Sequence, residues 1–141
     1  MTAEYKVDGA VAVITLNNPP VNGLGLALRQ AIVAGIDAAA SDPAVQAVVL
    51  IGNERFFSGG ADVREFGTPK AMQEPTLLTV IRTIERSPKP VIAAVNGATA
   101  TAILVNAAAV GVATALIPAA LALNAVIDAL QSVSAPAVIV I

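Results

Sequence analysis

The residues best suited to chemistry in this chain form a glycine-containing loop, Phe-Ser-Gly-Gly-Ala-Asp-Val, at residues 57–63. The loop follows the apolar run of residues 47–51, which has the composition of a buried strand. A strand that ends near a pair of glycines exposes backbone N–H groups, and such groups can stabilise negative charge on a carbonyl oxygen. The alternative interpretation is structural: residues 58–60 only turn the chain, and Asp62 only caps a short helix over residues 63–66.

Side chains for other kinds of chemistry are scarce. The 141 residues include neither cysteine nor histidine, which excludes thiol nucleophiles, Cys/His zinc sites and triads with an imidazole base. All eight lysines and arginines lie at or before Lys89, and Asp128 is the only charged residue after it. A net charge of -2 and 3% aromatic residues provide neither a basic patch nor a stacking surface, so we expect no nucleic-acid partner.

The pattern of the first two-thirds predicts an α/β fold. Residues 11–16 and 46–51 are short and apolar, as in strands, and residues 24–40 between them have apolar side chains at helical spacing. This unit predicts two parallel strands joined by a helix. A second helix would begin with Pro75 in its first turn and lead to a buried strand at residues 91–95. We expect its apolar face to consist of Leu78, Ile81 and Ile84, and we expect Phe56, Phe57 and Phe66 to lie in the core or to line a pocket.

The last third is apolar and rich in alanine. Residues 101–112 and 119–130 predict helices, and residues 137–141 predict a terminal strand. The uncharged segment between Lys89 and Asp128 exceeds the roughly 20 residues that span a bilayer, but its proline, asparagines and abundant alanine make a membrane span the weaker interpretation. The N-terminus is polar and has no secretory signal pattern, so we expect a cytoplasmic protein.

The loop at residues 57–63, with Asn-Asn-Pro-Pro-Val-Asn at residues 17–22 and Lys-Pro-Val-Ile-Ala-Ala-Val-Asn-Gly at residues 89–97, resembles the enoyl-CoA hydratase/isomerase (crotonase) family. The sequence of these segments most resembles the hydratase part of multifunctional fatty-acid β-oxidation enzymes. The resemblance implies a crotonase-like ββα spiral, represented by an N-terminal region at residues 1–97. An apolar helical tail at residues 98–141 does not match the family.

The resemblance also implies a substrate and a site. The substrate would be an acyl-CoA thioester, whose coenzyme A belongs to the substrate, so no separate cofactor and no metal are expected. In the family, two backbone N–H groups bind the thioester carbonyl. The first would belong here to Ala61, the expected catalytic residue, with Gly60, Asp62, Val63 and Arg64 completing the substrate-binding loop. Arg64 and Lys70 would either contact the phosphates of coenzyme A or lie on the solvated surface.

The family pattern predicts weak catalysis. It places the second N–H donor at Ala102 and the two catalytic glutamates at Val105 and Ala125, and neither valine nor alanine can transfer a proton. The nearest acid, Asp128, lies about one helical turn beyond the second position. One hypothesis is therefore an acyl-CoA-binding protein whose hydratase/isomerase activity is impaired. The other is an inactive truncated, frame-altered or redesigned fragment that acts in self-association, as a homo-oligomer, or in membrane attachment.

Overall fold

The computed structural model describes residues 2–53, 56–95 and 139–140, and all structural statements below concern these residues. Their framework is a five-stranded sheet with the strand order β1-β2-β3-β4-β5. The elements in chain order are β1 (Ala3–Asp8), β2 (Val11–Leu16), α1 (Leu26–Ser41), β3 (Ala47–Ile51), the 3-10 helices η1 (Val63–Glu65) and η2 (Pro69–Ala71), α2 (Leu77–Glu85), β4 (Val91–Ala94) and β5 (Ile139–Val140).

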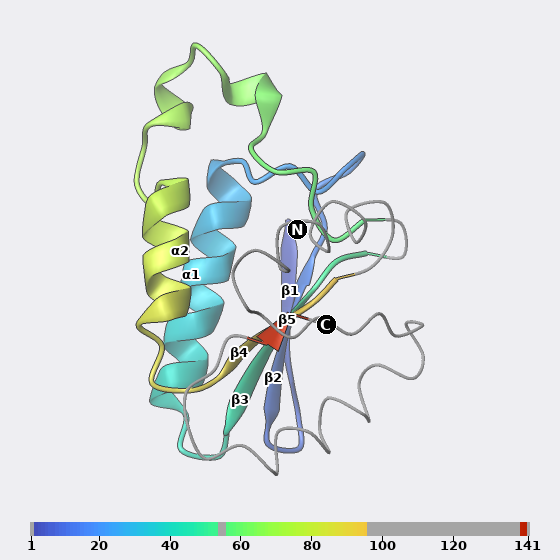
Figure 1. Ribbon diagram of the computed structural model, residues 1–141, viewed down its shortest axis with the longest axis vertical. Coiled ribbons are helices and arrows are strands. Elements are labelled where there is room, and N and C mark those ends of the chain that lie inside the picture. Colours follow the sequence, from blue (N-terminus) through green and yellow to red (C-terminus); the bar gives the residue numbers. More distant parts are fainter. Residues whose placement is uncertain (1, 54–55, 96–138, 141) are drawn as a thin grey trace.

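The sheet begins with an antiparallel hairpin and continues in parallel. β1 pairs with β2 antiparallel, and Gly9 in their turn has a φ of 57°, which glycine adopts without strain. β2 with β3, β3 with β4, and β4 with β5 are parallel pairs. The predicted unit of two parallel strands joined by a helix is thereby confirmed. Figure 1 shows α1 and α2 side by side along the sheet.

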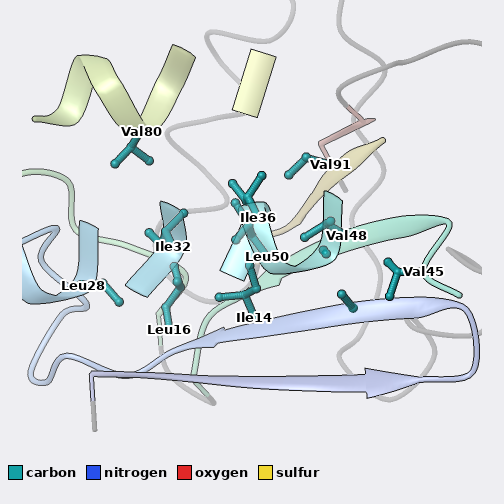
Figure 2. Packing of buried hydrophobic residues seen from close by; sticks show 12 residues of the cluster. Ile14, Leu16, Leu28, Ile32, Ile36, Val45, Val48, Leu50, Val80 and Val91 are labelled. Carbon is teal, nitrogen blue, oxygen red and sulfur yellow. The ribbon is translucent and has the colours of Figure 1, made fainter. Parts of the chain in front are cut away.

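The core lies between the helices and one face of the sheet. Ile14 and Val48 from the strands pack with Ile32 and Ile36 from α1 and with Val80 from α2 (Figure 2). The opposite face of the sheet is apolar too. It carries a second cluster of buried side chains: Val11, Val49, Ile92 and Ala94. The central strands are therefore buried on both faces, as parallel strands require.

The second helix differs from its prediction at both its start and its face. It begins at Leu77, and Thr76 is the N-cap, whose Oγ1 accepts a hydrogen bond from the Thr79 N–H at 3.2 Å. Pro75 thus precedes the helix. Of the predicted face, Ile84 packs against the core, but Leu78 and Ile81 are more than half exposed, whereas Val80 is buried. The helix carries two overlapping apolar stripes, and the sequence pattern alone does not decide which of them faces the core.

Other predictions have mixed outcomes. β1 was not predicted, because nearly all of its side chains are exposed and show no apolar pattern. Phe57 packs against the core, but Phe66 is 63% exposed and the prediction for it is wrong. Part of the predicted terminal strand is present as β5. The helices predicted at residues 101–112 and 119–130 lie outside the described residues. No helix in the described part is long and apolar enough to cross a membrane.

Candidate functional site

The predicted loop follows β3 and leads into η1. Gly60 within it has a φ of 89°, a left-handed conformation that other residues resist. Its carbonyl accepts a hydrogen bond from the Leu24 N–H at 2.7 Å, and the neighbouring Gly59 N–H donates to the Val21 carbonyl at 2.7 Å. Two hydrogen bonds thus join this loop to the loop that follows β2. The two loops lie far apart in sequence, so these hydrogen bonds form only when the chain is folded.

Among the described residues, the backbone N–H of Ala61 has no hydrogen-bond acceptor, and we call it free in this sense. No hydrogen bond among residues 2–53, 56–95 and 139–140 uses the N–H of Ala61 or of Asp62. Ala61 itself is half-buried, and its side chain is only a methyl group. Free backbone N–H groups held in a rigid turn are the type of group that stabilises a carbonyl oxygen as it gains charge.

Asp62 is anchored as a carboxylate. It caps η1, as predicted, by accepting a hydrogen bond from the Arg64 N–H at 3.0 Å through Oδ1. The Arg64 guanidinium contacts both carboxylate oxygens, at 2.8 and 2.6 Å, and the Asn18 amide reaches Oδ2 at 3.2 Å. The hydrogen bonds from the Arg64 side chain hold the pKa of Asp62 well below its usual range, although burial opposes them. Asp62 therefore stays ionised at neutral pH and does not donate a proton.

A buried ion pair holds the end of η1 against α1. Glu65 Oε2 lies 3.1 Å from Arg29 Nη1, and the side chain of Arg29 is only 3% exposed. Both oxygens of Glu65 also accept from the Leu26 N–H, at 2.9 and 3.0 Å. Glu65 thus caps the N-terminus of α1, which begins after Gly25 and has no cap from that residue.

Arg29 also joins α1 to the chain beyond η1. Its guanidinium donates to the carbonyls of Leu24 at 2.9 Å, Lys70 at 2.7 Å and Pro75 at 2.7 Å. These contacts of Arg29 and Glu65 were not predicted from the sequence. A signal was present: Arg29 shares helical spacing with Ile32 and Ile36, so it lies on the buried stripe of α1.

A hollow of about 570 Å³ lies beside this pair of loops. Asn18, Asp62 and Arg64 line one part of it, and Glu65, Thr68 and Lys70 line another. Arg64 and Lys70 are exposed. The hollow therefore has cationic side chains next to the loop that carries the free N–H of Ala61.

The residues that were predicted for substrate binding are consecutive, at residues 60–64, and their role in binding stays a prediction. Gly60 and Val63 are exposed at the loop, Ala61 is half-buried, and the Asp62 and Arg64 side chains form the ion pair. Ala102, Val105, Ala125 and Asp128, where the family pattern places the remaining functional positions, lie outside the described residues.

Solved structures with the same fold include enzymes of one class. A putative enoyl-CoA hydratase/carnithine racemase from Magnetospirillum magneticum aligns with a TM-score of 0.62 and 29% identity over 68% of this chain and 38% of its own. An enoyl-CoA hydratase from Mycobacterium marinum aligns with a TM-score of 0.60 and 33% identity, covering 69% of this chain and 49% of that one. The sheet and helices described above are thus a crotonase-type fold.

Sequence comparison leads to the same class. The chain is 48% identical over 96 residues to a peroxisomal bifunctional enzyme of Danio rerio and 38% identical over 97 residues to a probable enoyl-CoA hydratase of Bacillus subtilis. The family model for enoyl-CoA hydratase/isomerase matches residues 6–127. The chain belongs to the enoyl-CoA hydratase/isomerase family. The aligned part covers 67% of this chain and 13% of the fish protein, and 65% of this chain and 38% of the bacterial one.

Proposed function

We propose that this chain binds acyl-CoA thioesters and that the Ala61 N–H donates a hydrogen bond to the thioester carbonyl. The observation that carries the proposal is the free N–H of Ala61 in a loop braced by Gly59 and Gly60, in a chain of this family. The methyl side chain of Ala61 leaves room for a thioester to approach the backbone. A single donor of this kind contributes about 2.7–4 kcal/mol to stabilising a developing oxyanion.

The flanking residues support this geometry in different ways. Gly60 supplies the left-handed turn that precedes the donor. Asp62 anchors the chain after the donor through its bonds to Arg64 and Asn18. Val63 is 71% exposed beside the loop and offers apolar surface to the ligand's chain. No cofactor beyond the coenzyme A of the substrate is part of this proposal.

The phosphates of coenzyme A would be bound by the cationic part of the hollow. Arg64 and Lys70 both line it, and both are exposed. Arg64 is already paired with Asp62, so its guanidinium is held in one orientation by two hydrogen bonds. An oriented guanidinium loses less side-chain entropy when it binds a phosphate.

Turnover is a separate part of the proposal. We infer that hydration or isomerisation is impaired, because Val105 and Ala125 stand where the family pattern has proton-transferring glutamates. General acid–base catalysis contributes about 10²- to 10⁴-fold to a rate. Without it, the proposed oxyanion donor would be the remaining source of catalysis. Loss of the absorbance of a short enoyl-CoA, compared with a heat-treated control, measures this directly. A turnover typical of enzymes in general, about 10 s⁻¹ or more, would contradict impairment.

Binding is tested by thermal stabilisation of the protein with hexanoyl-CoA. We expect the wild-type protein to be stabilised more by hexanoyl-CoA than by free coenzyme A, because only the thioester reaches the Ala61 N–H. Ala61→Pro removes this N–H and should abolish the difference, whereas the control Ala61→Gly keeps the N–H and should retain it. Equal stabilisation of Ala61→Pro and wild type would overturn the proposal. Absence of binding together with self-association on a sizing column would support the alternative of an inactive fragment.

A further inference from the structure

Asn22 is a fully buried polar residue directly beneath the candidate loop. Its relative exposure is 0%, and its φ is 51°. Asparagine is one of the few residues other than glycine that adopts this left-handed conformation readily. A buried amide is costly unless its donors and acceptor are satisfied, so the partners of Asn22 are part of its function.

The side chain of Asn22 joins the ends of three segments. Its Nδ2 donates to the carbonyl of Leu16, at the end of β2, at 3.1 Å. The same nitrogen donates to the carbonyls of Phe56 and Phe57 at 2.8 and 3.2 Å, where the candidate loop begins. Its Oδ1 accepts from the Asn18 N–H at 2.7 Å and from Asn53 Nδ2 at 3.3 Å. One amide thus fixes the spacing between two loops that are 34 residues apart in sequence.

The backbone of Asn22 extends this contact towards Ala61. Ser58, itself buried, donates its hydroxyl hydrogen to the Asn22 carbonyl at 2.9 Å. The same hydroxyl oxygen accepts from the Gly60 N–H at 3.1 Å. The chain of hydrogen bonds therefore runs from Asn22 through Ser58 to Gly60, the residue immediately before the free N–H of Ala61.

We propose that Asn22 is a positioning residue for the Ala61 N–H. Its hydrogen bonds to Phe56, Phe57 and Ser58 fix the start of the loop. The contacts of Asp62 and Glu65 fix the end of the loop. Other side chains of similar size lack this combination. Aspartate keeps the volume but replaces the donor by an acceptor, so it would place a carboxylate against three carbonyl oxygens. Glycine tolerates the conformation and keeps the backbone carbonyl that accepts from Ser58, but it makes none of the side-chain bonds.

The first test uses the free protein and does not depend on the proposed function. Amide hydrogen exchange is measured by NMR in wild type, in Asn22→Gly and in Val48→Ala, a core variant near the start of β3, at the opposite end of the strand from the loop. In Asn22→Gly we expect Gly59 and Gly60 to exchange on the order of tenfold faster relative to the α1 amides. In Val48→Ala the loop and α1 amides should keep their wild-type ratio. An unchanged ratio in Asn22→Gly would overturn the inference.

Ser58→Ala is a milder variant in case Asn22→Gly does not fold. It removes the acceptor of the Gly60 N–H and leaves the bond from the Gly59 N–H to Val21. We expect faster exchange at Gly60 with little change at Gly59. Exchange at Gly60 equal to that of wild type would contradict the hydrogen-bond chain from Asn22.

The second test rests on the proposed function. The carbonyl stretch of ¹³C-labelled hexanoyl-CoA is recorded by difference infrared spectroscopy at saturating ligand. We expect a shift to lower frequency on binding to wild type and a clearly smaller shift with Asn22→Gly, because a displaced N–H polarises the carbonyl less. A merely structural role would lower stability and leave the shift unchanged. If wild type gives no shift, the proposed function fails, and the exchange test still decides the role of Asn22.

Discussion

At the scale of single residues, the candidate site depends on backbone donors and on side chains that fix them in place. The Ala61 N–H is not specific to alanine, since every residue except proline carries a backbone N–H. Its value comes from Gly60, which turns the chain, and from Asp62, which holds it. The residue types that matter for the proposed donor are therefore those of its two neighbours, Gly60 and Asp62.

The Asp62 carboxylate predicts a specific pH dependence of stability. Its pKa is lowered in the folded state, chiefly by hydrogen bonds from Arg64, so the unfolded chain binds a proton more readily. The stabilising contribution is complete above the unfolded pKa and is lost as the pH falls towards the folded pKa. Below about pH 5 the stability of wild type should decline, and Asp62→Asn should show a flatter decline.

Urea unfolding at several pH values measures the difference. Asp37→Asn, which removes one exposed carboxylate from α1, is the control for loss of a charge. Parallel pH profiles of wild type and Asp62→Asn would contradict the role given to the Arg64 contacts.

Lys70 allows a test of phosphate binding without disturbing the loop. Its carbonyl accepts from Arg29, but its side chain lines the hollow, so Lys70→Ala keeps the backbone contact. We expect this variant to bind hexanoyl-CoA more weakly, with the difference shrinking at high salt because exposed charges are screened. Lys6→Ala, which removes an equal charge from β1, should bind like wild type. Calorimetric titration at low and high salt distinguishes these outcomes.

At the scale of elements, the important contact is between α1 and the chain that follows the loop. Glu65 and Arg29 form a buried pair, whereas Arg64 in the neighbouring pair is 58% exposed. Removing one partner of a buried pair leaves an uncompensated charge, and removing an exposed partner costs little. The two arginines should therefore differ greatly when each is replaced by methionine.

Arg29→Met should lower the free energy of unfolding by about 3–5 kcal/mol, because Glu65 loses its partner and the Lys70 and Pro75 carbonyls lose a donor. Arg64→Met should cost clearly less, because solvent screens the exposed guanidinium, although Asp62 then loses two hydrogen bonds. Urea denaturation of both variants provides the comparison. Similar losses for the two variants would show that the buried pair has no special contribution.

Much of the framework is predictable because it is encoded locally. The apolar spacing of α1 and the continuous apolar composition of β3 identify both elements within one or two residues of their observed ends. β1 is not predictable in this way, since its exposed side chains carry no pattern and its strand conformation depends on pairing with β2. The loop was recognised from its glycines, but the contacts of Asn22, Arg29 and Glu65 join distant segments, so local patterns do not reveal them.

At the scale of the whole molecule, the sheet has apolar side chains on both faces. Ile36 of α1 belongs to the cluster under the helices, and Ile92 of β4 belongs to the cluster on the opposite face. Their exposed fractions are 1% and 0%. A sheet that is buried on both faces should unfold as one unit, because each face stabilises the same strands.

Ile36→Ala and Ile92→Ala should each lower the free energy of unfolding by about 2–5 kcal/mol, because each leaves a cavity in a buried cluster. Circular dichroism and intrinsic tyrosine fluorescence should report the same urea midpoint for each variant. Two separate midpoints, or a negligible effect of Ile92→Ala, would show that the second face does not belong to the cooperative unit.

The cap of α1 has an evolutionary consequence. A side chain at position 25 would ordinarily cap this helix, but a Cβ on Gly25 would lie 3.0 Å from both Asp62 Oδ2 and Glu65 Oε1. The N-terminus of α1 is thus capped by Glu65 and not by a side chain at position 25. In a lineage that loses Glu65, a capping side chain at position 25 would require the Asp62 carboxylate to move by a few tenths of an ångström, so changes at these three positions are coupled.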